Sequence, residues 1–308
     1  MLSVSIVRSV QILVLAICLM AGSAQAATVL IRTTLGDIEL ELLEAQAPVT
    51  TANFLNYIND DDYLQSFIHR SVPGFIIQGG GFRFVEGSSQ SVQADSPIVN
   101  EFSVSNIRGT VAMAKLSGNP DSATSQWFIN LSDNSSNLDD QNGGFTVFAR
   151  VLGDGMVVAD AIAALKIWQL EPPFSEIPLI DYDPSQTVAD VNLVFTAVSA
   201  DSDGDGSYDL DDAFPDNPEE TLDTDADGIG NNEDSDDDND LIPDEVELQL
   251  GLNPLNPLDA AGDLDGDSFD NVTEYLDGTD PQDAASNIRN TVLILKLLSR
   301  GSTDDDDS

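Results

Sequence analysis

Charge is distributed very unevenly along this chain of 308 residues, and this limits how its two parts can fold. Residues 27–200 contain 21 Asp and Glu against 7 Lys and Arg, whereas residues 201–308 contain 34 against 3. Carboxylates at such a density repel one another, and the second part has little apolar material to bury. We therefore place a domain boundary at Asp201. Nucleic acid is disfavoured as a partner because its phosphates would be repelled, whereas a divalent cation is favoured.

The amino-terminal segment has the pattern of an export signal. Arg8 supplies positive charge, residues 12–20 form an apolar run, and residues 24–26 read Ala-Gln-Ala, a small-residue cleavage site. We therefore assign residues 1–26 as a signal peptide and expect export to the periplasm, with the cell surface or the medium as alternatives. The apolar run is shorter than the roughly 20 residues that span a bilayer. We expect no transmembrane span in the mature chain.

The single cysteine, Cys18, lies inside this signal. A lipoprotein signal at Cys18 is an alternative, but Ile17 before it is bulky and the cleavage site downstream is better. The mature chain then has no thiol, which excludes disulfides, cysteine nucleophiles and thiolate metal sites. With His69 as the sole histidine, an ordinary zinc site is disfavoured, and a hydrolase is too because no G-x-S-x-G motif accompanies it.

Residues 27–200 have the periodicity of a mainly β domain. The segment TVLIRTTLGDIELELL, residues 28–43, alternates apolar and polar residues and predicts a hairpin. Residues 49–58, after Pro48, and residues 155–165 predict helices. Further apolar runs predict strands at residues 75–78, 110–114, 126–130, 146–152 and 192–198. Many short strands with few helices are typical of a closed antiparallel barrel.

Two segments carry a more specific signal, HRSVPGFIIQGGGF at residues 69–82 and DSATSQWFIN at residues 121–130. Together with PVTTANFLNYI, RGTVAMA and FTVFARV, they resemble the cyclophilins, which are peptidyl-prolyl cis/trans isomerases, and most nearly the bacterial exported type. The resemblance covers residues 28–198. It implies a closed antiparallel cyclophilin-like β-barrel with two capping helices. It also implies an enzyme that needs no cofactor for catalysis, acts on X-Pro bonds of exported polypeptides and assists their folding.

The same resemblance implies the residues of the site. Arg70 matches the catalytic arginine, and Gln78 matches a polar group that positions the peptide beside it. Asn137 stands where many members of the family carry an aromatic residue at the pocket rim. The residues that would bind the proline-containing peptide are Phe75, Ile76, Gln126, Phe128, Leu138 and Phe145.

The acidic region contains carboxylates at regular spacing. One pattern occurs twice, 27 residues apart, and places oxygen-bearing side chains at positions 1, 3, 5, 9 and 12 of a loop, as in calcium-binding EF-type loops. Position 6 is Leu241 or Ser268 in place of glycine. Two earlier segments resemble thrombospondin type 3 repeats. The predicted calcium ligands are Asp201, Asp203, Asp205, Asp209, Asp223, Asp225, Asp227, Asp236, Asp238, Asp240, Asp244, Glu247, Asp263, Asp265, Asp267, Asn271 and Glu274.

We accordingly assign residues 27–200 to an isomerase domain, 201–285 to a small module of calcium-binding repeats, and 286–308 to an apolar segment and acidic tail. The apolar run at residues 291–300 is too short to span a bilayer. Two alternative functions are a non-catalytic binder of proline-containing peptides and an extracellular calcium-dependent scaffold or adhesion protein. For the repeats, the alternative is an acidic tail that is disordered and binds no calcium.

Overall fold

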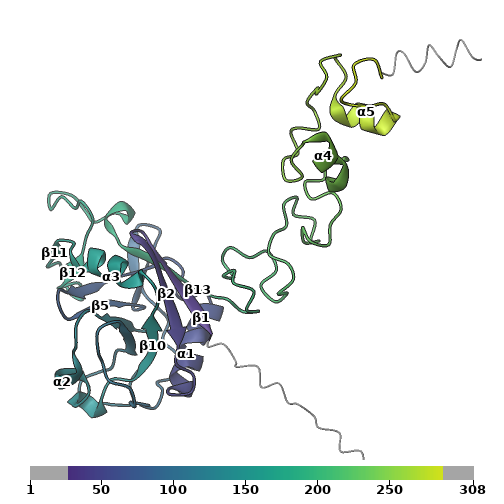
Figure 1. The fold of residues 1–308 in the computed structure, drawn as a ribbon. Coiled ribbons are helices and arrows are strands. Elements are labelled where there is room, and N and C mark those ends of the chain that lie inside the picture. Colours follow the sequence, from purple (N-terminus) through teal and green to yellow (C-terminus); the bar gives the residue numbers. More distant parts are fainter. Residues whose placement is uncertain (1–26, 287–308) are drawn as a thin grey trace, which may run out of the picture.

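The computed structural model describes residues 27–286, so the predicted signal peptide and the apolar run at residues 291–300 lie outside the described residues. Figure 1 shows a β-sheet domain followed by a line of loops that carries two short helices, α4 (Asp244–Leu250) and α5 (Asn271–Asp277). Within the described part of the chain, no helix combines the length and the apolar character needed to cross a membrane.

The β-sheet domain contains one large antiparallel sheet and one small one. The large sheet has 11 strands in the order β4-β5-β9-β8-β10-β2-β1-β13-β3-β6-β7, and the small one pairs β11 with β12. The strands are β1 Thr28–Thr33, β2 Gly36–Leu42, β3 Ser66–Phe67, β4 Arg70–Val72, β5 Ile76–Gly79, β6 Phe82–Val85, β7 Ser88–Ser91, β8 Thr110–Met113, β9 Trp127–Asn130, β10 Val147–Val151, β11 Ile167–Trp168, β12 Ile177–Pro178 and β13 Phe195–Ala200.

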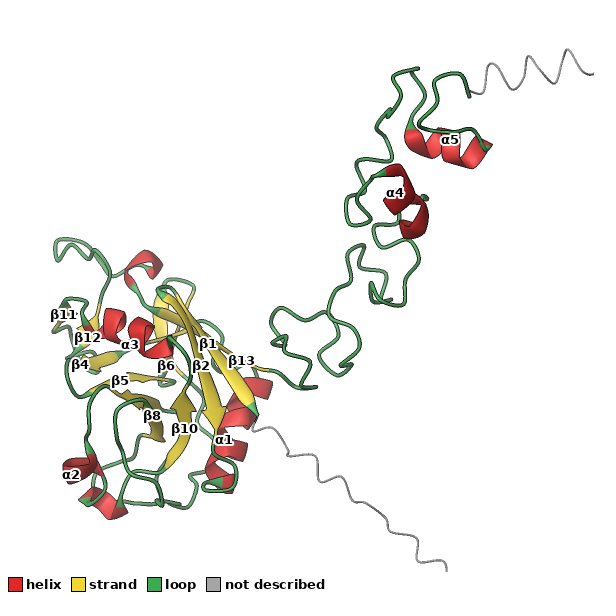
Figure 2. Cartoon of the chain, in the orientation of Figure 1, coloured by secondary structure: helices red, strands yellow, loops and turns green. Residues whose placement is uncertain are grey.

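The large sheet is strongly curled (Figure 2). Strands β3 and β4 are far apart in the strand order, yet only Ile68 and His69 separate them along the chain. The Ile68 N–H donates to the Val194 carbonyl at 2.9 Å and the His69 N–H to the Gln78 carbonyl at 3.1 Å, so this segment passes from β13 to β5. No ladder joins the end strands β4 and β7 within residues 27–286. The predicted closed barrel is therefore observed only as a curled antiparallel sheet.

Both predicted helices of the β-sheet domain are confirmed, as α1 (Pro48–Asn59) and α3 (Gly155–Ala163). Pro48 suits the first turn of α1, because N–H groups in the first turn have no acceptor within the helix and the N–H that proline lacks costs no hydrogen bond. Phe54 of α1 is fully buried, and its ring lies 4.8 Å from that of Phe148 in β10. The short helix α2 (Ser135–Leu138) was not predicted. The core of the domain therefore lies between the curled sheet and the helices.

The predicted strands are confirmed within a few residues, with one correction. The hairpin forms as β1 and β2, with Arg32 opposite Asp37. The run predicted at residues 192–198 starts late, because Asp190–Asn192 forms a 3-10 turn, and the strand β13 occupies Phe195–Ala200. Strands β3, β4, β6, β7, β11 and β12 were missed, since they have two to four residues and β7 is exposed throughout.

The acidic region has almost no apolar core. Within residues 201–286, the buried apolar side chains are Ile242, Ala260 and Pro281. Its order comes from repeated loops, in which backbone N–H groups donate to aspartate oxygens. In one of them the Asp240 and Leu241 N–H groups donate to the two oxygens of Asp236, each at 3.2 Å. These loops hold the carboxylates together, although like charges repel.

The first acidic loop is attached to the β-sheet domain. Arg32 on β1 makes a bidentate contact with Asp211, at 2.9 and 2.6 Å. The Asp209 N–H donates to the carbonyl of Ala200, the last residue of β13, at 2.8 Å. Both contacts lie at the β1–β13 side of the sheet, several strands away from β5 and β9 in the strand order.

Candidate active site

A pocket lies on the face of β5, β9 and β8 that points away from the main core. Side chains alternate between the two faces of a strand. In β5, Ile77 therefore packs in the main core, whereas Ile76 and Gln78 line the pocket. In β9, Trp127 is a core residue and Phe128 a pocket residue. The strands thus supply a hydrophobic core on one face and a binding surface on the other.

The pocket encloses about 320 Å³ and collects seven of the eight site residues that the family resemblance implies. The eighth, Gln126, reaches it through Gln78, whose Nε2 donates to the Gln126 Oε1 at 2.8 Å. The complete lining is Arg70, Phe75, Ile76, Gln78, Ala114, Lys115, Phe128, Asn137, Leu138, Gln141 and Phe145. The structure therefore brings the predicted catalytic and peptide-binding residues to one place.

The floor of the pocket is apolar. Phe128 and Phe145 meet edge to face, with ring centroids 5.8 Å apart, and Ile76 and Leu138 are almost fully buried beside them. Such a surface suits a ring of proline size, because their contact removes apolar area of both the pocket and the ring from water. Lys115 stands over Phe145 with its ammonium 4.9 Å from the ring centroid, and burial lowers the pKa of this lysine.

The edge of the pocket carries a chain of polar groups. Arg70 and Gln78 are paired residues of β4 and β5, so their side chains leave the sheet side by side. The Arg70 Nη1 donates to the Gln78 Oε1 at 3.4 Å, and Gln78 donates in turn to Gln126. Opposite Gln78 in the next ladder stands Phe128. Sheet register alone thus places the guanidinium beside the aromatic floor.

Glu176 binds the Arg70 guanidinium at Nε. The sequence analysis did not predict this residue. The Arg70 Nε donates to the Glu176 Oε2 at 2.7 Å, and the Ser71 N–H donates to the Glu176 carbonyl at 2.8 Å. With Nε and Nη1 occupied, Nη2 has no partner among residues 27–286. Glu176 lies 106 residues from Arg70 and just before β12, and no local motif marks it.

The glycines after Gln78 make room for the polar chain. A Cβ on Gly81 would lie 2.9 Å from the Gln126 side chain and 2.9 Å from the His69 ring. Gly80 has a φ of +71°, a conformation that side chains disfavour, and a Cβ there would lie 2.6 Å from the Ser125 carbonyl oxygen. A larger residue at Gly81 would displace Gln126, and one at Gly80 would collide with the backbone of Ser125 and the ring of Trp127.

His69 is a buried structural residue. It is 5% exposed, its ring contacts Phe82 edge to face at 5.1 Å, and its Nδ1 has no partner within the described residues. Burial, the main cause, lowers its pKa to about 4, although Gln126 opposes the shift by accepting a hydrogen bond. Among the described residues the side-chain hydrogen-bond partner of His69 is Gln126, and neither a serine nor a carboxylate bonds its ring as a hydrolase triad requires.

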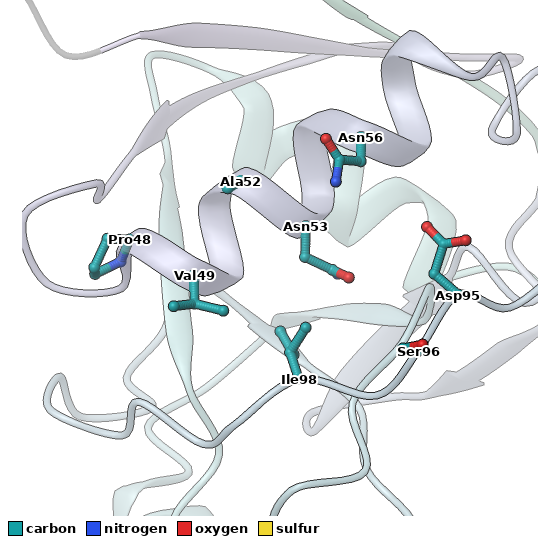
Figure 3. A pocket seen from close by; sticks show the side chains of 8 residues that line it. All are labelled: Pro48, Val49, Ala52, Asn53, Asn56, Asp95, Ser96 and Ile98. Atoms are coloured by element: carbon teal, nitrogen blue, oxygen red, sulfur yellow. The ribbon is translucent and has the colours of Figure 1, made fainter.

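A larger hollow of about 610 Å³ lies between α1 and residues 95–98 (Figure 3). Its lining includes Val49, Asn53 and Ile98, and Asp95 is its one ionisable residue. The Asp95 N–H donates to the Tyr57 hydroxyl, and Asn53 donates to the Thr124 carbonyl. The Asp95 backbone and the Asn53 side chain are thus engaged in holding the fold, and the lining contains no cationic side chain. Size therefore does not identify the active site.

The acidic region forms a second set of candidate sites. Four trios of aspartates lie at loop positions 1, 3 and 5, with one oxygen from each within 4.8 Å of the others. A fifth group consists of Asp240, Glu247 and Asp259, and it shares Asp240 with one of the trios. The four trios are Asp201, Asp203 and Asp205; Asp223, Asp225 and Asp227; Asp236, Asp238 and Asp240; and Asp263, Asp265 and Asp267.

These groups fit a hard divalent cation. At least one oxygen in each of the four loops is buried and lacks a hydrogen-bond partner within residues 27–286, as at Asp203, Asp225, Asp238 and Asp265. Burial is the main cause that raises the pKa of Glu247 to about 8, and the nearby Asp238 and Asp240 add to it. Such unneutralised oxygens are what calcium binds.

The structure does not bring the predicted position-9 ligands into these groups. The Oδ1 atoms of Asp209, Asp244 and Asn271 each accept a backbone N–H from position 2 of the same loop, at 2.9, 2.9 and 3.0 Å. These residues therefore close the loop. Glu274, at position 12 of the last loop, is fully buried, and its Oε2 lacks a partner within residues 27–286.

Position 6 has the same backbone geometry in loops with and without glycine. Gly206 and Gly228 have φ of +99° and +91°, and Leu241 and Ser268 have +82° and +79°. A left-handed residue with a side chain is strained, and such strain is kept where the surroundings require it. The replacement of glycine that is evident in the sequence therefore leaves the loop shape unchanged.

Comparison with known proteins points to the same family that the sequence motifs resemble. The family model described as cyclophilin type peptidyl-prolyl cis-trans isomerase matches residues 28–183. The peptidyl-prolyl cis-trans isomerase of Acinetobacter baylyi is 45% identical over 135 residues, covering 43% of this chain and 69% of that protein. Peptidyl-prolyl cis-trans isomerase A of Dickeya dadantii is 40% identical over 154 residues, covering 49% and 77%.

Among solved structures, a Cryptosporidium parvum cyclophilin type peptidyl-prolyl cis-trans isomerase in the presence of the dipeptide Ala-Pro is similar with a TM-score of 0.41 and 23% identity. The similarity covers 56% of this chain and 96% of that one. The family match to half of the chain and the curated relatives show that this chain belongs to the cyclophilin-type peptidyl-prolyl cis-trans isomerases. It is accordingly an isomerase of X-Pro peptide bonds.

Proposed function

We propose that the pocket holds the proline ring of its substrate while Arg70 stabilises the twisted peptide bond. The observation that carries this assignment is the guanidinium at the edge of the apolar floor, which is held at Nε and Nη1, while Nη2 has no partner among residues 27–286. A fixed donor with one open N–H is what the reaction needs. Phe75, Ile76, Phe128, Leu138 and Phe145 would contact the ring.

The chemistry follows from the electronic structure of the amide. Rotation about an X-Pro bond faces a barrier of about 18 to 20 kcal/mol because the planar amide loses its resonance. In the twisted state the proline nitrogen regains a lone pair, which can accept a hydrogen bond that the planar ground state cannot. A guanidinium donor already in place therefore stabilises the transition state selectively. Arginine remains protonated throughout and offers a rigid set of donors.

Gln78 and Gln126 have a different task in this proposal. Gln78 accepts from Arg70 and donates to Gln126, so one hydrogen-bonded chain fixes all three side chains. Gln126 immediately precedes β9 and lies two residues before Phe128, where its amide can bind the peptide backbone beside the proline. The ring is thus held while the preceding carbonyl rotates.

The substrates in this proposal are exported polypeptides, whose folding the isomerase assists in the periplasm. Support comes from the signal-like pattern of residues 1–26. The same sequence features accommodate release to the cell surface or the medium.

The acidic region, in this proposal, is a structural calcium module. Support comes from buried oxygens without partners in each of its loops, such as those of Asp203, Asp238 and Asp265, and from the near absence of an apolar core. Calcium would neutralise these carboxylates and order the loops, since hard cations prefer oxygen ligands. The pocket contains no residue of this region, so calcium has no role in the isomerisation itself.

The catalytic assignment is tested with Arg70→Ala in a protease-coupled isomerisation assay on the mature chain. One preorganised donor contributes about 2 to 4 kcal/mol, so kcat/KM should fall about 30- to 1000-fold. Arg32→Ala removes an exposed arginine on β1 and should leave the rate unchanged. Equal rates for Arg70→Ala and the wild type, with both folded, would refute the role of Arg70.

A further inference from the structure

Asp259 occupies the connection between two acidic loops, and the carboxylate pattern did not predict it as a ligand. One oxygen each of Asp240, Glu247 and Asp259 lie within 4.8 Å of one another. Asp240 belongs to the loop that leads into α4 and Glu247 lies on α4, whereas Asp259 precedes the loop that leads into α5. The two helices are neighbours along the acidic line in Figure 1.

Glu247 shows that this group is built to bind something. Its side chain is fully buried, and neither carboxylate oxygen has a partner among the described residues. The Asp240 Oδ2 and the Asp259 Oδ1 are also buried and unpartnered. Three carboxylates placed this close without a neutralising group would be strongly unfavourable, because each loses hydration and repels the other two.

The other polar atoms of Asp259 hold its position. Its Oδ2 accepts the Asn253 N–H at 2.9 Å, which closes the turn after α4. Its carbonyl oxygen accepts the Gly262 N–H at 2.8 Å and the Asn271 Nδ2 at 2.9 Å, which reach it from the following loop. The remaining oxygen, Oδ1, is the one that faces Asp240 and Glu247.

We propose that Asp240, Glu247 and Asp259 together bind one calcium ion that joins the loop before α4 to the connection that leads into the next loop. This inference rests on the proposed calcium function of the module and adds a ligand from outside the loop. Three hard oxygen donors from a loop and from the connection after it are suited to calcium, which accepts irregular sets of 6 to 8 oxygens with water completing the shell. A bound ion would then fix the next loop relative to α4, because the Asp259 carbonyl contacts Gly262 and Asn271 of that loop.

The second copy of the repeat supplies a natural comparison. Twenty-seven residues after Asp259 stands Ser286, whose Oγ accepts the Asp280 N–H at 3.1 Å, just as Asp259 accepts the Asn253 N–H. The turn therefore forms with a serine, and it does not need a carboxylate. The turn therefore does not account for the negative charge of Asp259. In the proposal, this charge serves to bind the ion together with Asp240 and Glu247.

The test is a calcium titration of the full mature chain by calorimetry, after complete removal of metal. Asp259→Ser installs the residue that the second copy uses, and should weaken one calcium at least tenfold while the other sites are retained. Asp277→Ser is the charge-matched control, because Asp277 is exposed on α5 and outside the carboxylate groups. It should titrate like the wild type.

A second readout follows the link itself. Hydrogen exchange of the Asn253 and Gly262 amides should slow with calcium in the wild type and in Asp277→Ser, but not in Asp259→Ser. Asp259→Asn keeps the acceptor for Asn253 and removes only the charge, so it should reproduce the loss if Asp259→Ser proves poorly folded.

The outcomes separate the two proposals. If the wild type binds no calcium, the calcium function of the module fails, and the link fails with it. If the wild type binds calcium and both Asp259 variants titrate and exchange as it does, calcium binding stands and the link is overturned.

Discussion

The two parts of this molecule differ in which kinds of buried polar atom lack a hydrogen-bond partner. Sixteen buried side-chain polar atoms lack a partner within residues 27–286; four lie in the β-sheet domain, and none of these is a carboxylate oxygen. The other twelve lie in the acidic region, and all of them are carboxylate oxygens. The β-sheet domain encloses a core of fully buried aromatic residues such as Trp127, Tyr63 and Phe148, whereas the acidic region buries little beyond Ile242 and Ala260.

This contrast shows that the two parts fold for different reasons. Burial of apolar surface stabilises the β-sheet domain in any aqueous buffer. The acidic region lacks that source of stability, and its buried oxygens make the folded form unfavourable unless, as we propose, a cation neutralises them. The stability of one part should therefore depend on the ion content of the buffer, and that of the other should not.

Removal of calcium gives the largest expected effect. With chelator, self-repulsion among the carboxylates should expand residues 201–286, whereas bound cations stabilise the compact form by mass action. Small-angle scattering should show a larger radius, and limited proteolysis should cut the acidic region first. The isomerisation rate should change by less than about twofold, since the contacts at Arg32 and Ala200 lie away from the pocket.

Restoring calcium should reverse the expansion, and magnesium at the same concentration should do so less well. An unchanged radius would contradict the calcium module. A parallel loss of isomerase activity would contradict the independence of the two parts.

Acid should destabilise the β-sheet domain through His69. Its pKa is about 4 in the folded state against 6.5 for the free side chain, so the unfolded state binds the proton first. The resulting stability is present above pH 6.5 and is lost as the pH falls toward 4. The difference amounts to about 3 kcal/mol, at 1.36 kcal/mol for each pKa unit.

Denaturant unfolding followed by tryptophan fluorescence checks this, because both tryptophans, Trp127 and Trp168, lie in the β-sheet domain. His69→Gln stays neutral and should flatten the pH dependence between 6.5 and 4. The idea fails if the variant and the wild type lose the same stability over that interval. Calcium is kept saturating throughout.

Glu176 gives the smallest expected effect. Glu176→Ala removes the acceptor that holds the Arg70 Nε, and should lower kcat about three- to tenfold with little change in KM. Glu176→Gln keeps an acceptor at the same place and should restore most of the rate. Glu171→Ala, an exposed acid on the same connection, is the control. A loss in KM alone would indicate that Glu176 contacts the substrate and does not position Arg70.

Much of the site could be predicted from the two segments that resemble the cyclophilins, because Arg70, Gln78 and Phe128 lie within them, and the ladders β4–β5 and β5–β9 then bring these residues side by side. Glu176 could not, since its contact with Arg70 depends on how β12 docks beside β4, 106 residues along the chain. The curl of the sheet depends in the same way on the path of Ile68 and His69 between β13 and β5.

In the acidic region, spacing predicted the aspartates at positions 1, 3 and 5, because a calcium loop requires them at fixed places. Spacing could not distinguish an oxygen that binds an ion from one that accepts a backbone N–H, as at Asp244. Asp259 was missed for the opposite reason, since it lies outside any loop and reaches its partners only after the repeats pack.

The pairing of Asp259 with Ser286 at equivalent turns gives the acidic array a polarity. Asp259 adds a carboxylate to the loop before α4, whereas Ser286, at the equivalent turn after α5, adds none. The last loop, with Asp263, Asp265 and Asp267, therefore lacks the reinforcement that its predecessor has. As free calcium falls, the array should fray from its carboxyl end toward the β-sheet domain, so its length in solution would report the calcium concentration around it.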